Sequence, residues 1–147
     1  MRVKCLCALA ILAAGWTNAS MASDETDILQ PIDRFFEAFA RRDKAGIVAE
    51  AAAPDVPLMS ERQGELRRLT VEGLGDVLQT AFKGSALSET LHNPVIRVDG
   101  TLGMVWAPYE LLVDGKPDHC GTDIFTLLKV QGRWQIVGIT DNRHAGC

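Results

Sequence analysis

The stretch that decides the fold covers residues 89–142 and reads ETLHNPVIRVDGTLGMVWAPYELLVDGKPDHCGTDIFTLLKVQGRWQIVGITDN. Three turn signals divide it at hairpin spacing: Asp99-Gly100, Asp114-Gly115 and Gln131-Gly132. A two-residue pair of this kind between apolar runs favours a type I′ turn, because both central residues need a positive φ. The stretch therefore predicts four antiparallel strands, over 89–98, 101–113, 116–130 and 133–142.

Upstream of this stretch the apolar residues recur at helical spacing. Ile28, Ile32 and Phe35 predict a helix over 28–41, with Asp27 as its cap and Pro31 in its first turn. Asp43 and Thr70 are suited to cap two further helices, over 44–53 and 71–82. Between those helices, 56–60 and 66–69 can pair as a small hairpin around Gln63-Gly64.

This element order predicts one α+β domain. Three helices in the N-terminal half pack on a curved antiparallel sheet of four long strands plus the small hairpin. Such a sheet buries one face under its helices. The strand over 101–113 is apolar on both faces, so we expect a second copy of the chain to cover the outer face as a homodimer.

The N-terminus reads as a secretory signal peptide over residues 1–22. Arg2 and Lys4 precede an apolar run over 5–15, and Ser20-Met21-Ala22 offers a site for cleavage after Ala22. The run is too short for a membrane helix, so we expect no stable membrane insertion. The expected mature domain covers 23–147 and is periplasmic or secreted.

Charge and cysteine content agree with this compartment. The chain carries a net charge of −4, and removal of Arg2 and Lys4 makes the mature part more acidic, which argues against a nucleic-acid partner. Cys120 and Cys147 remain after cleavage. In an oxidising compartment they form either a disulfide or two separate thiols, one of them buried.

Regular two-residue turns fix which residues face one another across each hairpin. One row on the helix-covered face contains Asn93, Trp106, Asp123 and Thr140, and a second contains Glu89, Glu110, His119 and His144. Phe125 continues this face, whereas Tyr109 falls on the opposite one. Pro117 leaves open a longer middle loop, over Asp114–Pro117, which would shift the pairing of the two flanking strands by two residues. Such a shift would change the cross-strand partners, but each side chain would stay on the same face of the sheet.

The predicted face has the composition of a small-molecule site, an apolar concavity with a few polar groups. Trp106, Asn93, Glu110, Thr140 and Phe125 are the candidate ligand-binding residues. A buried Asp123 would have a raised pKa and could accept a proton, with His119 as its acid partner or orienting group. The alternatives are a hydrogen-bonded core carboxylate at Asp123 and a structural or solvent-facing His119.

Motifs for metal or cofactor chemistry are lacking in the sequence. There is no HExxH pattern, no paired-cysteine spacing, no phosphate loop and no dinucleotide fingerprint. A site formed by Glu110, His119 and His144 is the one metal alternative, and no spacing supports it. We therefore expect neither a metal ion nor a cofactor.

Several segments resemble a known superfamily. They are Asp33-Arg34-Phe35-Phe36, Arg97-Val98-Asp99-Gly100, Val105-Trp106-Ala107-Pro108-Tyr109-Glu110, Val113-Asp114-Gly115-Lys116, His119-Cys120-Gly121 and Gly146-Cys147. Together with the element order they are similar to the nuclear transport factor 2-like superfamily, which includes SnoaL-like polyketide cyclases and ketosteroid isomerases, and to its small exported branch of lumazine-binding-like proteins. The resemblance implies a cone-shaped roll. It does not imply one function, because this fold hosts enzymes, ligand binders and interaction domains.

Three functions are open at this point. The first is an exported small-molecule-binding or interaction domain of the cell envelope, with an apolar pocket for a small apolar or aromatic molecule. The second is a cofactor-free dehydratase, cyclase or isomerase that uses Asp123 and His119 for proton transfer. The third is a structural homodimer without a pocket. A tyrosine-based isomerase is disfavoured here, since the predicted pocket face has no tyrosine.

Overall fold

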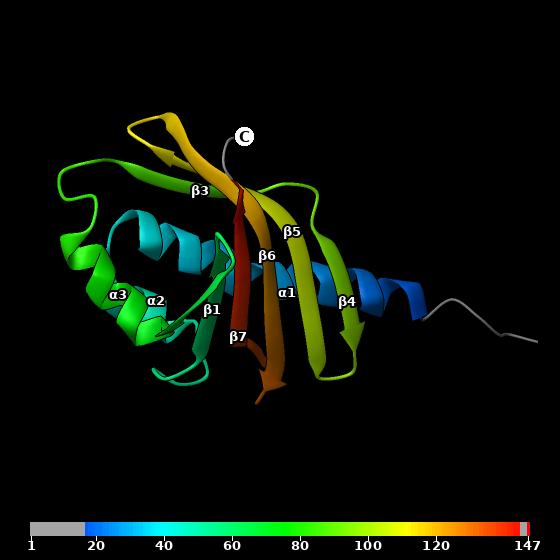
Figure 1. Cartoon of the computed structure of the whole chain (residues 1–147). Coiled ribbons are helices and arrows are strands. Elements are labelled where there is room, and N and C mark those ends of the chain that lie inside the picture. The colour runs from blue at the N-terminus through cyan, green and yellow to red at the C-terminus, as the bar shows by residue number, and fades with distance from the viewer. Residues whose placement is uncertain (1–16, 145–146) are drawn as a thin grey trace, which may run out of the picture.

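The computed structural model describes residues 17–144 and Cys147 (Figure 1). Three helices and seven strands follow one another in the order α1 (Thr17–Ala40), α2 (Lys44–Ala49), β1 (Pro57–Arg62), β2 (Glu65–Thr70), α3 (Val71–Thr80), β3 (Leu87–Leu91), β4 (Val95–Asp99), β5 (Leu102–Val113), β6 (Lys116–Val130) and β7 (Arg133–His144). The predicted α+β class is confirmed, with the helices gathered on one side of a curved sheet to form a cone-shaped roll.

The helix caps agree with the sequence prediction, but the helix lengths differ from the predicted ones. Asp43 accepts a hydrogen bond from the Gly46 amide at the start of α2, and Thr70 accepts one from the Gly73 amide at the start of α3. Helix α1 begins at Thr17, ten residues before the predicted cap, so Pro31 lies inside it. Residues 17–22 of the predicted signal peptide are thus helical, and residues 1–16 lie outside the described part of the chain.

The sheet is mixed, which differs from the all-antiparallel prediction. Its strand order is β2-β1-β7-β6-β5-β3, and β4 also pairs with β5. The small hairpin of β1 and β2 joins the main sheet because β1 lies parallel to β7, with Leu58 opposite Ile139. The predicted strand over 89–98 is split into β3 and β4 at Asn93, whose φ of 47° breaks the extended backbone.

Two one-residue bulges change the register that regular turns would give. Between β5 and β6, Leu112 faces Pro117 but Leu111 faces His119, so Asp118 is an extra residue. Between β6 and β7, Leu127 faces Ile136 but Thr126 faces Gly138, so Val137 is extra. A one-residue shift moves every following side chain to the other face of its partner strand.

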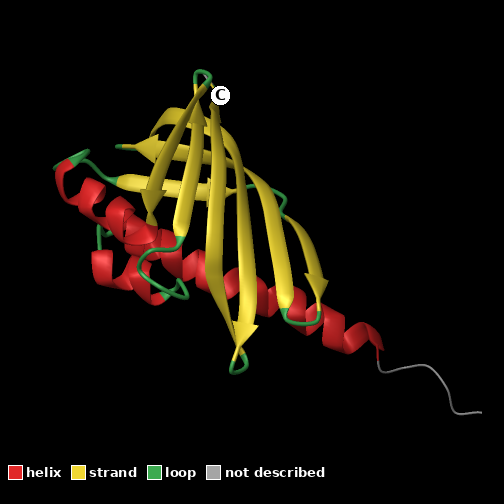
Figure 2. Ribbon diagram, turned by 60° about the horizontal axis from the view of Figure 1, so that its bottom comes forward, coloured by secondary structure: helices red, strands yellow, loops and turns green. Residues whose placement is uncertain are grey.

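The core lies between the concave face of the sheet and α1. Ile28, Ile32 and Phe35 form the buried stripe of α1, as predicted. The ring of Phe35 meets that of Phe125 on β6 at a centroid distance of 6.1 Å. Figure 2 shows the long strands in front of α1, with the convex face of the sheet turned away from the helices.

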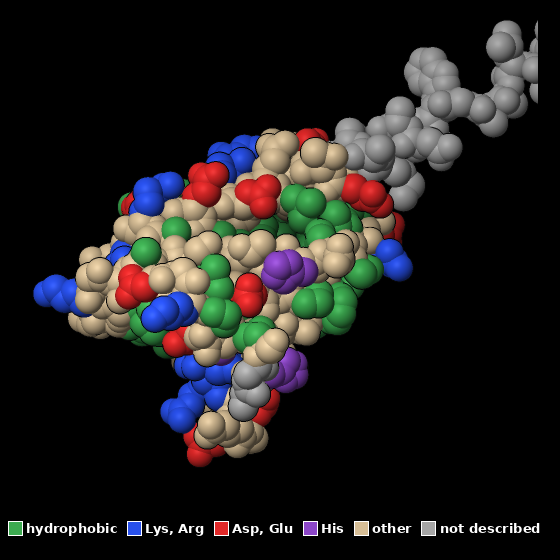
Figure 3. Space-filling model, turned by 90° about the horizontal axis from the view of Figure 1, so that it is seen from above, with side chains coloured by type: hydrophobic (Ala, Val, Ile, Leu, Met, Phe, Trp, Pro, Cys, Tyr) green, Lys and Arg blue, Asp and Glu red, His purple; other side chains and the backbone are tan. Residues whose placement is uncertain are grey.

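The surface shows charges of both signs. In Figure 3, Lys and Arg side chains are interspersed with Asp and Glu side chains over most of the face shown. Across the described part of the chain, no helix is both long enough and apolar enough to cross a membrane.

Candidate functional site

A cavity of about 620 Å³ lies between the concave face of the sheet and the helices. All five phenylalanines of the chain line it: Phe35, Phe36, Phe39, Phe82 and Phe125. Leucines from α3 and from the neighbouring strands complete its apolar walls. The polar lining comes mainly from the strands. The cavity therefore has the usual form of a small-molecule site, apolar walls with a few convergent polar groups.

The two bulges determine which polar side chains reach this cavity. Because of the extra Asp118, β6 presents His119 and Asp123 beside Leu111 and Ala107 of β5, where the regular register would place Glu110 and Trp106. Because of the extra Val137, Asp141 of β7 stands opposite Asp123, where the regular register would place Thr140. The site thus collects odd-numbered residues of all three strands.

Three carboxyl groups meet at the cavity wall, those of Glu89, Asp123 and Asp141. Asp123 is 3% exposed. Burial raises its pKa to about 7, and the charge of Asp141 contributes to the shift. Burial and the neighbouring Asp123 also raise the pKa of Glu89 well above its ordinary value. The Glu89 carboxyl donates a hydrogen bond to Asp123, so the pair holds a shared proton at neutral pH.

Asp141 is held in a different way. The hydroxyl of buried Ser60, on β1, donates a hydrogen bond to Asp141 Oδ1. Arg62 Nε in turn donates to Ser60 Oγ at 3.2 Å. Burial raises the pKa of Asp141, while Ser60 and the nearby arginines lower it. The parallel pairing of β1 with β7 is what brings Ser60 opposite Asp141.

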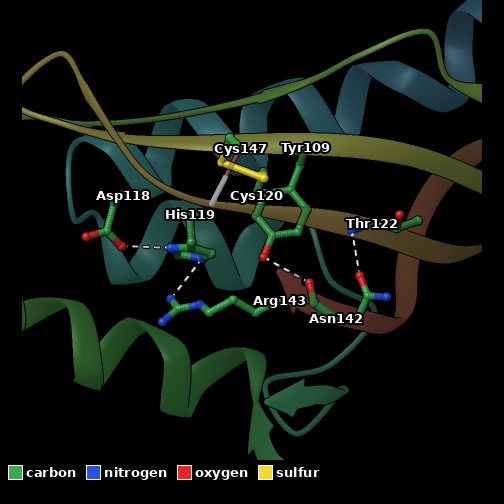
Figure 4. Close-up of a disulfide and its surroundings, with 8 residues drawn as sticks. All are labelled: Tyr109, Asp118, His119, Cys120, Thr122, Asn142, Arg143 and Cys147. Atoms are coloured by element: carbon green, nitrogen blue, oxygen red, sulfur yellow. Dashed lines mark hydrogen bonds and ion pairs between the residues drawn. A yellow bond between two sulfur atoms is a disulfide. The ribbon is translucent and has the colours of Figure 1, made fainter. Parts of the chain in front are cut away.

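His119 lies between Asp118 and Arg143 in a hydrogen-bonded chain (Figure 4). The ring nitrogen Nδ1 lies 2.7 Å from Asp118 Oδ2, and Nε2 lies 2.8 Å from Arg143 Nη2. A guanidinium can only donate, so Nε2 accepts and Nδ1 carries the proton. Burial lowers the pKa of His119, and the charge of Arg143 lowers it further against the opposing effect of Asp118. The histidine is therefore neutral near pH 7 and positions Arg143.

Tyr109 also lines the cavity, on the face opposite to the predicted one. Its hydroxyl donates to the Asn142 carbonyl oxygen at 3.1 Å, and its ring meets that of His119 edge to face (Figure 4). Burial raises the pKa of its hydroxyl above the ordinary value, so the group stays protonated. The sequence argument against a tyrosine on this face is therefore wrong.

Among the predicted site residues, His119, Asp123 and Phe125 line the cavity. The predicted placement of Trp106, Glu110 and Thr140 is wrong, because the bulges turn these residues to the convex face; Trp106 is 38% exposed there. Asn93 is exposed in the β3–β4 connection. The predicted partnership of Asp123 with His119 is replaced by that of Asp123 with Glu89.

Eight polar residues of the cavity wall are absent from the predicted ligand set: Ser60, Arg62, Arg67, Arg68, Glu89, Tyr109, Asp141 and Arg143. The predicted face of Glu89, which is the face that carries His119, is correct because the break at Asn93 and the bulge at Asp118 offset each other. Ile139, Asp141 and Arg143 occupy every second position of β7 and therefore share one face. This period of two is the sequence signal that could have identified Asp141 and Arg143 as cavity residues.

A disulfide joins Cys120 to Cys147, with 5.6 Å between their Cα atoms. Cys120 directly follows His119 on β6, so the bond fixes the C-terminus next to the Asp118–His119–Arg143 chain (Figure 4). In the part of the chain that the structure describes, no three His, Cys, Asp or Glu side chains are arranged to hold a metal ion.

A cone-shaped roll with a cavity under the helices defines the nuclear transport factor 2-like class, and solved structures of that class match the chain. One, a protein of unknown function from Shewanella baltica OS155, is 20% identical, with a TM-score of 0.67 over 85% of this chain and 97% of that one. Another, from Novosphingobium aromaticivorans, is 12% identical, with a TM-score of 0.71 over 90% and 92%. A third, from Mycobacterium tuberculosis, is 13% identical, with a TM-score of 0.74 over 88% and 77%.

Within that class, the chain belongs to the family described as "Putative lumazine-binding", whose pattern matches residues 23–140. A comparison with curated proteins finds no match. The structural likenesses, all at low identity, establish the fold, and the family assignment agrees with a domain that contains a ligand cavity.

Proposed function

We propose that this protein binds a small, planar and largely apolar molecule in the cavity under its helices. The observation that carries the proposal is the cavity of about 620 Å³ lined by every phenylalanine of the chain. Phe36 and Phe125, with centroids 5.7 Å apart and rings nearly perpendicular, offer edge and face contacts to a ring system. The description of the family, "Putative lumazine-binding", names a planar bicyclic ligand and supports the planar shape in this proposal.

Calorimetric titration with bicyclic aromatic compounds tests this proposal. We expect Leu74→Trp, which fills the cavity from α3, to weaken binding at least tenfold, because the added ring occupies the volume of the ligand. Leu66→Trp is the matched control, since Leu66 is 55% exposed on edge strand β2 and does not line the cavity. Equal binding by both variants, or no binding by the wild type, would contradict a cavity site.

A second function rests on the Glu89–Asp123 pair, namely cofactor-free proton transfer. With a pKa of about 7, Asp123 is suited to take a proton from a carbon acid at neutral pH, and protonated Glu89 is its hydrogen-bond donor. In such a step the C–H bond breaks, an O–H bond forms on Asp123, and the electron pair is delocalised into the adjacent carbonyl of the substrate.

Hydrogen–deuterium exchange next to the carbonyl of bicyclic ketones, followed by NMR in D₂O, measures this activity without knowledge of the product. We expect exchange by the wild type and at least a tenfold loss in Asp123→Asn, with exposed Asp99→Asn as the control. Exchange that is unchanged in Asp123→Asn would exclude Asp123 as the base.

We also propose that the protein is exported to the periplasm or secreted. The basic and apolar residues at the N-terminus support export, as does a disulfide between the two cysteines of the predicted mature chain. Expression with the full leader followed by intact-mass measurement tests the proposal. We expect a mature N-terminus at Ser23, and an uncleaved chain retained with the cytosol would contradict it.

A further inference from the structure

Four arginines line the cavity, although the chain as a whole is acidic. Arg62, Arg67 and Arg68 come from the β1–β2 hairpin, and Arg143 comes from β7. The whole chain has a net charge of −4, so this concentration of positive charge does not reflect its composition. A cavity with cationic walls attracts anionic ligands and raises their local concentration.

Most of these arginines have no carboxylate partner. Arg67 is 2.9 Å from Glu65 on its own strand. Among the described residues, Arg62, Arg68 and Arg143 have no acidic side chain within ion-pair distance. Glu89 and Asp123 bond to each other, and Asp141 accepts a hydrogen bond from Ser60. The charges of Arg62 and Arg143 lower the pKa of Asp141 from a distance, but neither arginine forms an ion pair with it.

Arg143 is partly buried, and one of its donors has no hydrogen-bond partner in the described part of the chain. Its Nη2 group donates to His119 Nε2, a neutral acceptor that does not compensate the guanidinium charge. Its Nε atom is buried and has no hydrogen-bond partner in the described part of the chain. A buried donor without an acceptor costs free energy, and a buried charge costs more. The Asp118–His119 pair nevertheless holds the guanidinium in place (Figure 4).

We propose that the cavity selects ligands that carry a carboxylate or a similar oxyanion on an apolar ring body, with the oxyanion bound by Arg143. The inference rests on the proposed binding function and names the class of ligand. The oxyanion pairs with the guanidinium of Arg143, which lines the cavity and is held by His119, and compensates its charge. The phenylalanine-lined wall takes the ring body, and Arg62 and Arg68 favour entry of the anion. Aromatic and alicyclic carboxylic acids are the class that fits.

A matched pair of probes tests this inference. Calorimetric titration of the wild type at pH 7 with 2-naphthoate and with 2-naphthamide compares a carboxylate with its neutral isostere of nearly equal shape. We expect the carboxylate to bind about tenfold tighter or more, because a charge-assisted hydrogen bond to a partly buried guanidinium is stronger than a neutral one. Arg143→Gln should bring the two affinities together, and Arg143→Lys should keep part of the difference.

Arg97→Gln is the control, since Arg97 is exposed on β4 and bonds only to the Ile96 carbonyl oxygen in the described structure. Equal binding of both probes by the wild type overturns the anion preference and leaves the proposed cavity function standing. A carboxylate preference that survives in folded Arg143→Gln overturns the assignment to Arg143. Failure of both probes to bind overturns the anion preference and counts against the proposed function as well. The wild-type comparison decides the preference even if Arg143→Gln does not fold.

Discussion

Asp123 on β6 and Asp141 on β7 are direct cross-strand partners on the face of the sheet that lines the cavity. Two ionised carboxylates in such a pair repel each other, and burial adds to the cost. The structure limits that cost in two ways. Ser60 donates to Asp141, which favours its ionised form, and Glu89 shares a proton with Asp123. The cavity wall therefore holds fewer negative charges than carboxyl groups at neutral pH.

Replacement of Asp123 by Asn should change how stability depends on pH. The folded pKa of about 7 lies above the ordinary value of 3.8, so this group favours the folded state below about pH 4 and loses that contribution as pH rises through 7. We expect Asp123→Asn to be more stable than the wild type at pH 8, by on the order of 2 kcal/mol, with a smaller difference at pH 5. Urea unfolding at both pH values measures this, with Asp99→Asn as control; identical pH profiles would contradict the burial of a protonated Asp123.

Gly121 should not tolerate a side chain. A Cβ atom there would collide with the backbone carbonyl of Asn142 and lie 2.8 Å from the Tyr109 ring. Neither the β6–β7 ladder nor the buried ring can move freely, so we expect Gly121→Ala to lower the free energy of unfolding by about 2–3 kcal/mol. Gly138→Ala is the matched control on β7, where the nearest atom would be 3.9 Å away. Chemical unfolding compares the two, and equal losses would show that strand geometry at Gly121 is less constrained than described.

Loss of the disulfide should destabilise the chain without changing the fold. The bond between Cys120 and Cys147 closes a loop with a sequence separation of 27. In the chain-entropy account, removal of such a link lowers the free energy of unfolding by about 3–4 kcal/mol. Urea unfolding of the wild type with and without reductant measures this loss. The double variant Cys120→Ser, Cys147→Ser should match the reduced wild type and respond to reductant no further.

The predicted homodimer would form through the convex face of the sheet. Val95, Leu102, Trp106 and Leu128 are all more than a third exposed, and the register places Val95 beside Trp106 and Leu102 beside Leu128. Exposed apolar pairs of this kind on one face of a sheet indicate an association surface. We expect light scattering to give the mass of a dimer for the wild type and of a monomer for Trp106→Lys. Leu66→Lys, at an exposed position of edge strand β2, is the control; a monomeric wild type would contradict the prediction.

The fold was predictable because its signals are local. Gln63-Gly64, Asp114-Gly115 and Gln131-Gly132 all adopt the positive φ values of type I′ turns, and their flanking apolar runs form the strands. The prediction for Asp99-Gly100 is wrong in its register: only Gly100 has a positive φ, and Asp99 is still part of β4, where it pairs with Leu102. Asp43 and Thr70 cap helices for the same reason, since a short side-chain acceptor reaches the free amides within one turn. The parallel contact between β1 and β7 was not predictable in this way, because no local signal marks a pairing between segments so distant in the sequence.

The candidate site was predictable only in part, because it depends on register. His119, Asp123 and Phe125 share one strand, so their common face followed from the period of two. Trp106 and Thr140 belong to the neighbouring strands, and each was assigned through a regular ladder that the bulges interrupt. Neither Asp118 nor Val137 has a residue type that demands a bulge, so the sequence alone does not locate the irregularities.

The bulge at Asp118 also bears on how proteins of this shape diversify. Deletion of this single codon would restore a regular ladder between β5 and β6 and bring Trp106 and Glu110 to the face now occupied by Ala107 and Tyr109, or expel His119 and Asp123 from it. The helices and the outline of the cone would be unaffected. Short insertions and deletions in the long strands are therefore an efficient evolutionary route to new cavity chemistry in this architecture, since one such event exchanges an entire set of side chains that point substitutions could replace only one at a time.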